Sequence, residues 1–197
     1  MNLVGKFQIN QGAFIEILIP DTEDKFNYYY EPNNALHMFD EVTVILKKGN
    51  AEITLEIDHI NEIVQSLRKS LQLTLANECQ LPEQITLGEL GICYNKNVSA
   101  RTHNQIDYHR FWLFSLPKGP QTWLYSQDKK IYLEIVPSYP WLYSDLEEEQ
   151  KKEGFIPFDE FMKTYKPIFV GEISQETAQH WIMQCDKILA SMVMVKP

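Results

Sequence analysis

Short runs of β-branched and aromatic residues, separated by polar stretches, fill the first third of the chain. Such runs occupy residues 14–19, 42–46 and 53–57 and are typical of β-strands. The last two flank Lys48-Gly49-Asn50, whose glycine suits a tight connection between antiparallel strands. We therefore predict a β-hairpin over residues 42–57.

The spacing of apolar residues changes after this hairpin and predicts a helix buried on one face. Asp58 is expected to be its N-cap, and the helix should end before Pro82. The apolar positions recur at intervals of three and four residues, as on one side of an α-helix. They are Ile60, Ile63, Val64, Leu67 and Leu71.

Strand-like runs return in the middle of the chain. They cover residues 90–94, 110–116, 122–125 and 131–136 and are separated by glycine, proline and the polar turn 126–129. This succession of short strands predicts an antiparallel meander.

Two helices are expected near the C-terminus. The first covers residues 158–165, beginning beside Pro157 and ending before Pro167. The second has Ser174 as its N-cap and a continuous apolar stripe that must pack on a sheet or another helix. The stripe consists of Ala178, Trp181, Ile182, Cys185, Ile188, Leu189 and Met192.

These elements together predict an α+β fold, in which an antiparallel β-sheet or meander packs against a few helices and a C-terminal amphipathic helix. The length of 197 residues fits one domain over residues 1–197. We find no internal repeat and no low-complexity linker that would mark a domain boundary.

Composition narrows the class of protein. Hydrophobic residues make up 44% and charged residues 23%, as in ordinary globular proteins. The three cysteines are odd in number and far apart, which argues against a disulfide framework or a zinc site and favours a reducing compartment. No apolar run resembles a signal peptide or a membrane span. We expect a cytoplasmic protein without a metal or cofactor.

The charge balance bears on the partner. The chain has 27 acidic and 18 basic residues and a formal net charge of −9. This charge disfavours binding to a nucleic acid or to an anionic membrane and favours a cationic partner. The alternative interpretation is that the charge only keeps the protein soluble.

The most reactive-looking group of residues lies between positions 101 and 110. Arg101, His103, Asp107, His109 and Arg110 could act as an acid/base set on a phosphate ester. His103 and His109 are six residues apart at the entry to a predicted strand, a spacing that does not make them converge on one atom. A polar loop is the simpler interpretation, and a hydrolase or phosphodiesterase using these two histidines is the enzymatic alternative.

A second candidate site combines aromatic and acidic residues. Ser144 and Glu147 form a capping box that opens a solvated helix over residues 144–153, and this helix has almost no apolar face. We predict that the segment meets a basic partner, and the alternative is a solvated connecting helix that touches nothing. The proposed binding residues are Trp141, Tyr143, Asp145, Glu147, Glu148 and Glu149.

The C-terminal part of the chain resembles a known family. The strand pair 123–125 and 131–137, then Tyr165-Lys166-Pro167 and the helix over 173–181, is similar to the small acidic immunity proteins of bacterial contact-dependent inhibition and related polymorphic toxin systems. The resemblance is one of pattern and size.

The resemblance implies a cytoplasmic, non-enzymatic protein that binds and neutralises one cognate toxin domain, often a nuclease. Nuclease active sites are lined with Lys and Arg, so an acidic surface is their electrostatic complement. We expect a monomer or small homo-oligomer. A self-associating structural or regulatory module remains a third alternative, which light scattering would detect.

Overall fold

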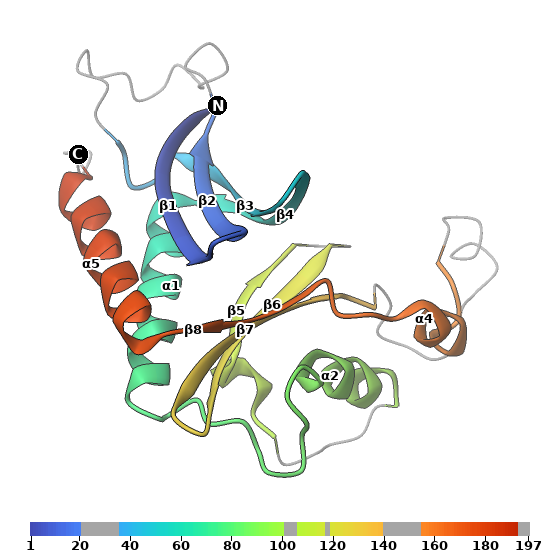
Figure 1. Cartoon of the computed structure of the whole chain (residues 1–197). Coiled ribbons are helices and arrows are strands. Elements are labelled where there is room, and N and C mark those ends of the chain that lie inside the picture. The colour runs from blue at the N-terminus through green and yellow to red at the C-terminus, as the bar shows by residue number, and fades with distance from the viewer. Residues whose placement is uncertain (21–35, 101–105, 117–118, 140–154, 193–197) are drawn as a thin grey trace.

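The computed structural model describes residues 1–20, 36–100, 106–116, 119–139 and 155–192 (Figure 1). It contains two four-stranded antiparallel sheets, each built from strands in sequence order. The predicted α+β fold with a C-terminal helix is therefore confirmed.

The first sheet has the order β1 (Asn2–Asn10), β2 (Ala13–Ile19), β3 (Glu41–Lys48) and β4 (Ala51–His59). The three predicted strands are confirmed as β2, β3 and β4. Strand β1 was not predicted. Only two of its side chains are fully buried, because the other face of the sheet meets solvent, and two buried positions make a weak apolar pattern.

The second sheet has the order β5 (Trp112–Ser115), β6 (Pro120–Gln127), β7 (Lys130–Pro137) and β8 (Phe169–Ile173). The predicted central pair is confirmed and is longer than expected. Strand β8 was not predicted, since it is short and reaches its partner β7 from far along the chain.

Both predicted hairpin turns are present. Lys48 pairs directly with Ala51, which leaves a two-residue connection in which Gly49 has a φ of 58°. In the β6–β7 hairpin, Asp128 and Lys129 have φ values of 50° and 65°. Positive φ at both central residues gives a turn whose twist matches that of paired strands.

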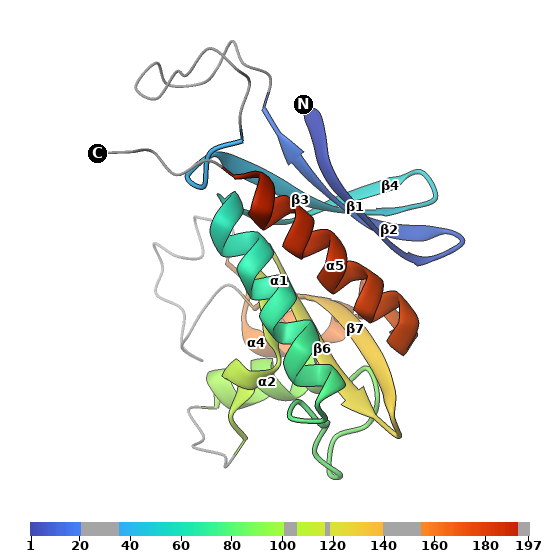
Figure 2. The same cartoon turned by 90° about the vertical axis from the view of Figure 1, so that its left-hand side faces the viewer.

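Each sheet is followed by a long helix, α1 (Ile60–Leu75) after the first and α5 (Gln175–Ser191) after the second. The two helices lie side by side in front of both sheets (Figure 2). Helix α1 packs against β5 and β6 as well as β4, and α5 packs against β1. Each long helix thus contacts the first strand of the other sheet.

The topology is consequently repeated, although we found no repeat in the sequence. Four antiparallel strands and a long helix occur twice, and β4 lies beside β5 as β8 lies beside β1. The repetition is one of topology, and it is compatible with the absence of a repeat in the sequence. Each unit of four strands and a helix buries one set of positions and exposes another. Different side chains can fill the same set of positions, so the repeated topology leaves no recognisable period in the sequence.

Helix α1 confirms the predicted apolar stripe but not the predicted cap. Its N-cap is His59, whereas Asp58 accepts a hydrogen bond from the His59 backbone N–H at 2.7 Å. The backbone N–H of Ile60 is bound instead by the carbonyl oxygen of Asp40, at 2.9 Å. The preceding loop supplies the acceptor that a capping side chain would otherwise provide.

Helix α5 confirms its prediction in detail. The Ser174 side chain accepts a hydrogen bond from the backbone N–H of Thr177 at 3.0 Å. Trp181 is 1% exposed, its ring lies edge-on at 5.5 Å from that of Phe7, and its Nε1 donates to the carbonyl oxygen of Gln8 at 3.2 Å. Trp181 therefore ties α5 to strand β1.

Two central segments differ from their predictions. Residues 90–94, predicted as a strand, begin helix α2 (Leu90–Ser99), because a short apolar run does not by itself distinguish helix from strand. The strand predicted over 110–116 starts only at Trp112, after a 3₁₀ turn over Tyr108–Arg110. The short helix expected at 158–165 is confirmed as α4 (Phe158–Thr164).

The second sheet is buried on both faces. Leu124 of β6 belongs to the main core shared with both long helices, whereas its neighbours Trp123 and Tyr125 point into a second core under α2. Close packing there depends on Gly91, since a Cβ atom at this position would lie 2.4 Å from Val136 Cγ2. Among the described residues, the first sheet has a core on one face only.

Candidate functional site

The outer face of the first sheet, on the side away from α1 and α5, is a candidate binding surface. The strand register places Leu3, Leu18, Thr43 and Ile57 in one row across all four strands. Leu3 is 55% exposed and Ile57 is 46% exposed, while Leu18 and Thr43 are half-buried. A largely apolar row therefore lies at the surface.

Phe39 extends this row beyond the end of the sheet. It is 58% exposed, and its ring lies edge-on at 5.8 Å from that of His59. The Nδ1 atom of His59 is 2.9 Å from the Phe39 carbonyl oxygen. Because His59 follows Ile57 by two residues on β4, both side chains project on the same side of the strand.

Ion pairs connect charged side chains on the rest of the outer face. Glu16 lies 3.6 Å from the ammonium of Lys6 and 3.1 Å from that of Lys47, which also pairs with Glu52 at 2.9 Å. The Lys6 ammonium lies 3.6 Å from the centre of the Phe14 ring. Hydrogen bonds to Glu52 and Glu16 raise the pKa of Lys47. Both lysine ammonium groups of this face therefore already interact with neighbouring side chains of the same face.

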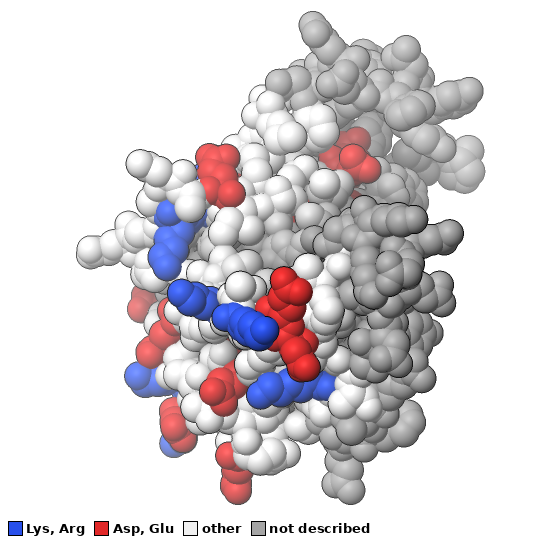
Figure 3. Space-filling view, turned by 90° about the vertical axis from the view of Figure 1, so that its right-hand side faces the viewer, with Lys and Arg blue, Asp and Glu red and all other residues white. Residues whose placement is uncertain are grey.

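Acidic and basic side chains are also mixed elsewhere. Figure 3 shows them interspersed among the described residues on the side that carries α4. The described carboxylates on that side therefore do not form a single patch.

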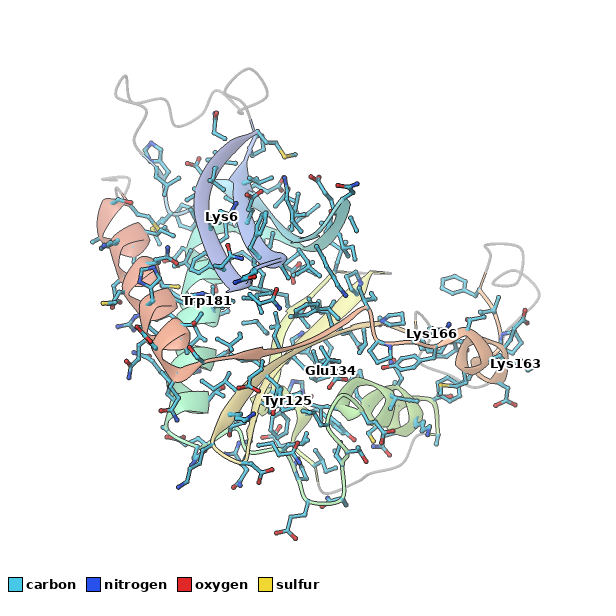
Figure 4. All side chains as sticks on the ribbon, in the orientation of Figure 1. Lys6, Tyr125, Glu134, Lys163, Lys166 and Trp181 are labelled. Atoms are coloured by element: carbon cyan, nitrogen blue, oxygen red, sulfur yellow. The ribbon has the colours of Figure 1, made fainter. Side chains whose placement is uncertain are left out.

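The most unusual buried group is Glu134 on β7, which is fully buried (Figure 4). Its carboxylate accepts hydrogen bonds from the backbone N–H of Leu90 at 3.3 Å, the N–H of Gly91 at 2.8 Å and the hydroxyl of Tyr125 at 2.8 Å. The Tyr125 hydroxyl in turn accepts from the N–H of Gly88 at 3.1 Å. Glu134 and Tyr125 therefore fix the N-terminal end of α2 on the second sheet.

Burial controls the protonation of this pair. Loss of solvation raises the pKa of Glu134, even though its hydrogen-bond donors favour the carboxylate. Burial and the neighbouring Glu134 carboxylate raise the pKa of Tyr125. Since the carboxylate bonds the first turn of a helix, where backbone N–H groups lack partners, its geometry is that of a structural clamp.

The cysteines are placed as weakly reactive thiols. Burial raises the pKa of Cys79 and Cys93, and that of Cys185 to about 12. Cys79 donates a hydrogen bond to the carbonyl oxygen of Arg110 at 3.0 Å. Cys185 lies in the apolar face of α5, as predicted. All three thiols stay protonated at neutral pH, and the thiol is not the nucleophilic form.

The predicted acid/base residues are only partly described. Arg101 and His103 lie outside the described residues. His109 stacks on Trp112 with ring centres 6.5 Å apart, and the Arg110 guanidinium donates to the carbonyl oxygen of Glu78. The described part of this cluster forms a surface turn, and whether His103 approaches His109 stays a prediction.

A shallow hollow of about 450 Å³ lies between α1 and α5. It is lined by polar residues of α1 and by Leu189, and it includes Arg68 and Lys69. Arg68 is already paired with Asp186 of α5 at 2.5 Å. The hollow therefore contains an ion pair that links the two helices.

The predicted partner-binding segment lies outside the described residues and stays a prediction. Its residues are Trp141, Tyr143, Asp145, Glu147, Glu148 and Glu149.

Sequence reasoning missed the outer-face row, because its members come from four different strands and meet only through the strand register. It also missed Glu134, for which a signal existed. A charged residue inside the apolar run 131–136 indicates a buried polar partner.

The described residues provide neither a metal site nor a membrane-spanning helix. Among them, no group of three or more His, Cys, Asp or Glu side chains is placed to hold a metal ion. No helix in the described part of the chain combines the length and apolar character needed to cross a membrane.

Comparisons with known proteins found no matching family model, no matching curated protein and no matching solved structure.

Proposed function

We propose that this chain is a non-enzymatic immunity protein of the cytoplasm that binds and blocks one basic toxin domain, such as a nuclease domain. Its role is stoichiometric binding. The observation that carries the proposal is the outer face of the first sheet, which no described helix covers, beside a second sheet whose two faces are both covered.

The size of that face suits a protein partner. Four strands about 4.8 Å apart, each contributing about seven residues at about 3.4 Å per residue, make an area of roughly 450 Å². A specific protein interface buries about 800 Å² on each partner, so this face supplies about half of one. Small molecules are usually bound in concave pockets instead.

The charge supports a basic partner. A formal charge of −9 favours encounter with a positively charged surface and disfavours encounter with nucleic acid. A nuclease domain carries such a surface where it holds phosphates.

The buried reactive-looking groups support a binding role rather than an enzymatic one. Glu134 and Tyr125 hold the end of α2, Cys79 is bonded to a backbone carbonyl, and Cys185 is packed between helices. Each of these groups has a structural partner that occupies it.

The proposal predicts that a neighbouring reading frame encodes a toxin domain, and the test is a titration of that purified domain with this chain. The residual activity of that domain should fall linearly and reach zero at one equivalent of this chain, because a blocking protein acts by occupancy. Complete inactivation by a small fraction of an equivalent would instead indicate turnover. Persistence of full toxin activity at a large excess of this chain would refute the proposal.

The enzymatic alternative is tested in parallel. The chain and its His109→Ala variant are compared on phosphodiester and ester substrates. A hydrolysis rate that the variant loses would assign the function to the histidine cluster.

A further inference from the structure

We infer that the toxin domain docks on the apolar end of the outer face, defined as Leu3, Leu18, Ile57 and Phe39, with an exposed apolar side chain flanked by Lys or Arg. This inference rests on the proposed function and names the surface that performs it. Three separate features of the apolar end lead to it.

The first feature is the concentration of exposed apolar side chains. Leu3, Ile57 and Phe39 are all more than 40% exposed, and they lie along one row and its extension. Single exposed apolar residues are common on protein surfaces, whereas contiguous ones mark interaction sites.

The second feature is the difference between the outer faces of the two sheets. On the second sheet, the corresponding face carries Trp123 and Tyr125, and α2 covers both with a well-packed second core. The repeated topology therefore provides, within one chain, the covered state of a face that no described helix covers on the first sheet. A partner on the first sheet would fill the place that α2 fills on the second.

The third feature is the charge around the apolar end. Lys6 and Lys47 form ion pairs with carboxylates of the same face, so their charges are largely neutralised and repel a basic partner only weakly. Glu41 pairs with His59 across the strands, lies on the same face and is exposed, whereas Asp58 pairs with the buried Val42 and projects to the other face. Among the described residues, no Lys or Arg forms an ion pair with Glu41. Its carboxylate is therefore the group at this end that can attract a basic partner.

These features suggest a division of roles. The apolar side chains sit on hydrogen-bonded strands and need little ordering when the partner binds, so they serve as the anchor. The Glu41 carboxylate at the edge guides the encounter and disfavours acidic partners. Changes to the anchor should therefore alter dissociation, and a change to Glu41 should alter association.

The experiment measures both rate constants for the toxin domain by surface plasmon resonance at low and high salt. Ile57→Ala and Phe39→Ala should each speed dissociation by about tenfold or more. Glu41→Lys should slow association several-fold at low salt, and the difference should shrink at high salt. Leu3→Ala provides a further anchor variant.

Matched controls separate the surface from general effects. Met183→Ala removes an apolar side chain that is 54% exposed on α5, and Glu83→Lys reverses an exposed charge on the segment before α2. Both controls should keep wild-type rate constants. Thermal unfolding of every variant confirms that it is folded.

Each outcome has one meaning. If the wild type binds the toxin domain and all apolar-end variants bind equally well, this inference is wrong and the proposed function stands. If the wild type does not bind that domain at all, both are wrong. Concentration-dependent dimerisation by light scattering, abolished by Ile57→Ala, would assign the face to a second copy of the chain and overturn the inference.

Discussion

Replacing Trp181 with alanine should lower the free energy of unfolding by about 3 to 5 kcal/mol, one of the two largest losses expected from a single substitution. The side chain is 1% exposed, packs on Phe7 and donates to the carbonyl of Gln8. Its removal leaves a cavity where α5 meets β1 and an acceptor without its donor. Urea titration of the two proteins measures the loss.

The control for this prediction is Met183→Ala on the exposed side of the same helix. That change should alter stability by less than about 0.5 kcal/mol. A loss of below about 1 kcal/mol for Trp181→Ala would contradict the packing of α5 on the first sheet.

Replacing Glu134 with alanine should cost about 3 kcal/mol or more. Three buried donors would lose their acceptor at once: the N–H groups of Leu90 and Gly91 and the hydroxyl of Tyr125. Glu134→Gln keeps one acceptor oxygen and should cost less. The two variants are compared with the wild type by urea titration, and equal stability of all three would show that the clamp does not hold α2.

The Glu134 clamp should also depend on pH in a defined direction. The pKa of Glu134 is raised in the folded protein, so the folded state binds its proton more tightly than the unfolded state does. The contribution of this proton to stability is fully present below the unfolded value of 4.5 and is lost as pH rises through the raised value. The advantage of the wild type over Glu134→Gln should therefore grow as pH falls from neutrality toward about 4.5.

The elements that could be predicted from the sequence are those with a strong local pattern. Helices α1 and α5 each show a long apolar stripe at helical spacing, and the hairpins show β-rich runs around a turn. In these segments the local preference and the burial agree, so the sequence pattern is unambiguous.

The elements that were missed depend on partners far away in the chain. Helix α2 begins where the carboxylate of Glu134 bonds its first N–H groups, 43 and 44 residues distant in sequence. Strand β8 pairs with β7 across an insertion that includes α4. A short segment has too little periodicity to show its conformation before such a partner is known.

The candidate surface was beyond sequence reasoning for a similar reason. Leu3, Leu18 and Ile57 are ordinary strand residues when each is considered alone, and only the register of four strands brings them into one row. The charge pattern, in contrast, was visible in the composition and led to the expectation of a basic partner. The proposed class of partner thus comes from the sequence, and the proposed binding surface comes from the fold.

The central claim is that the toxin domain binds on the outer face of the first sheet. The most direct measurement is a methyl NMR titration of the labelled chain with one equivalent of that domain. The methyl signals of Leu3, Leu18 and Ile57 should shift or broaden, while those of Leu87 and Val170, which are exposed on other parts of the surface, should not. Changes confined to Leu87 and Val170, with the three outer-face residues unaffected, would contradict the account.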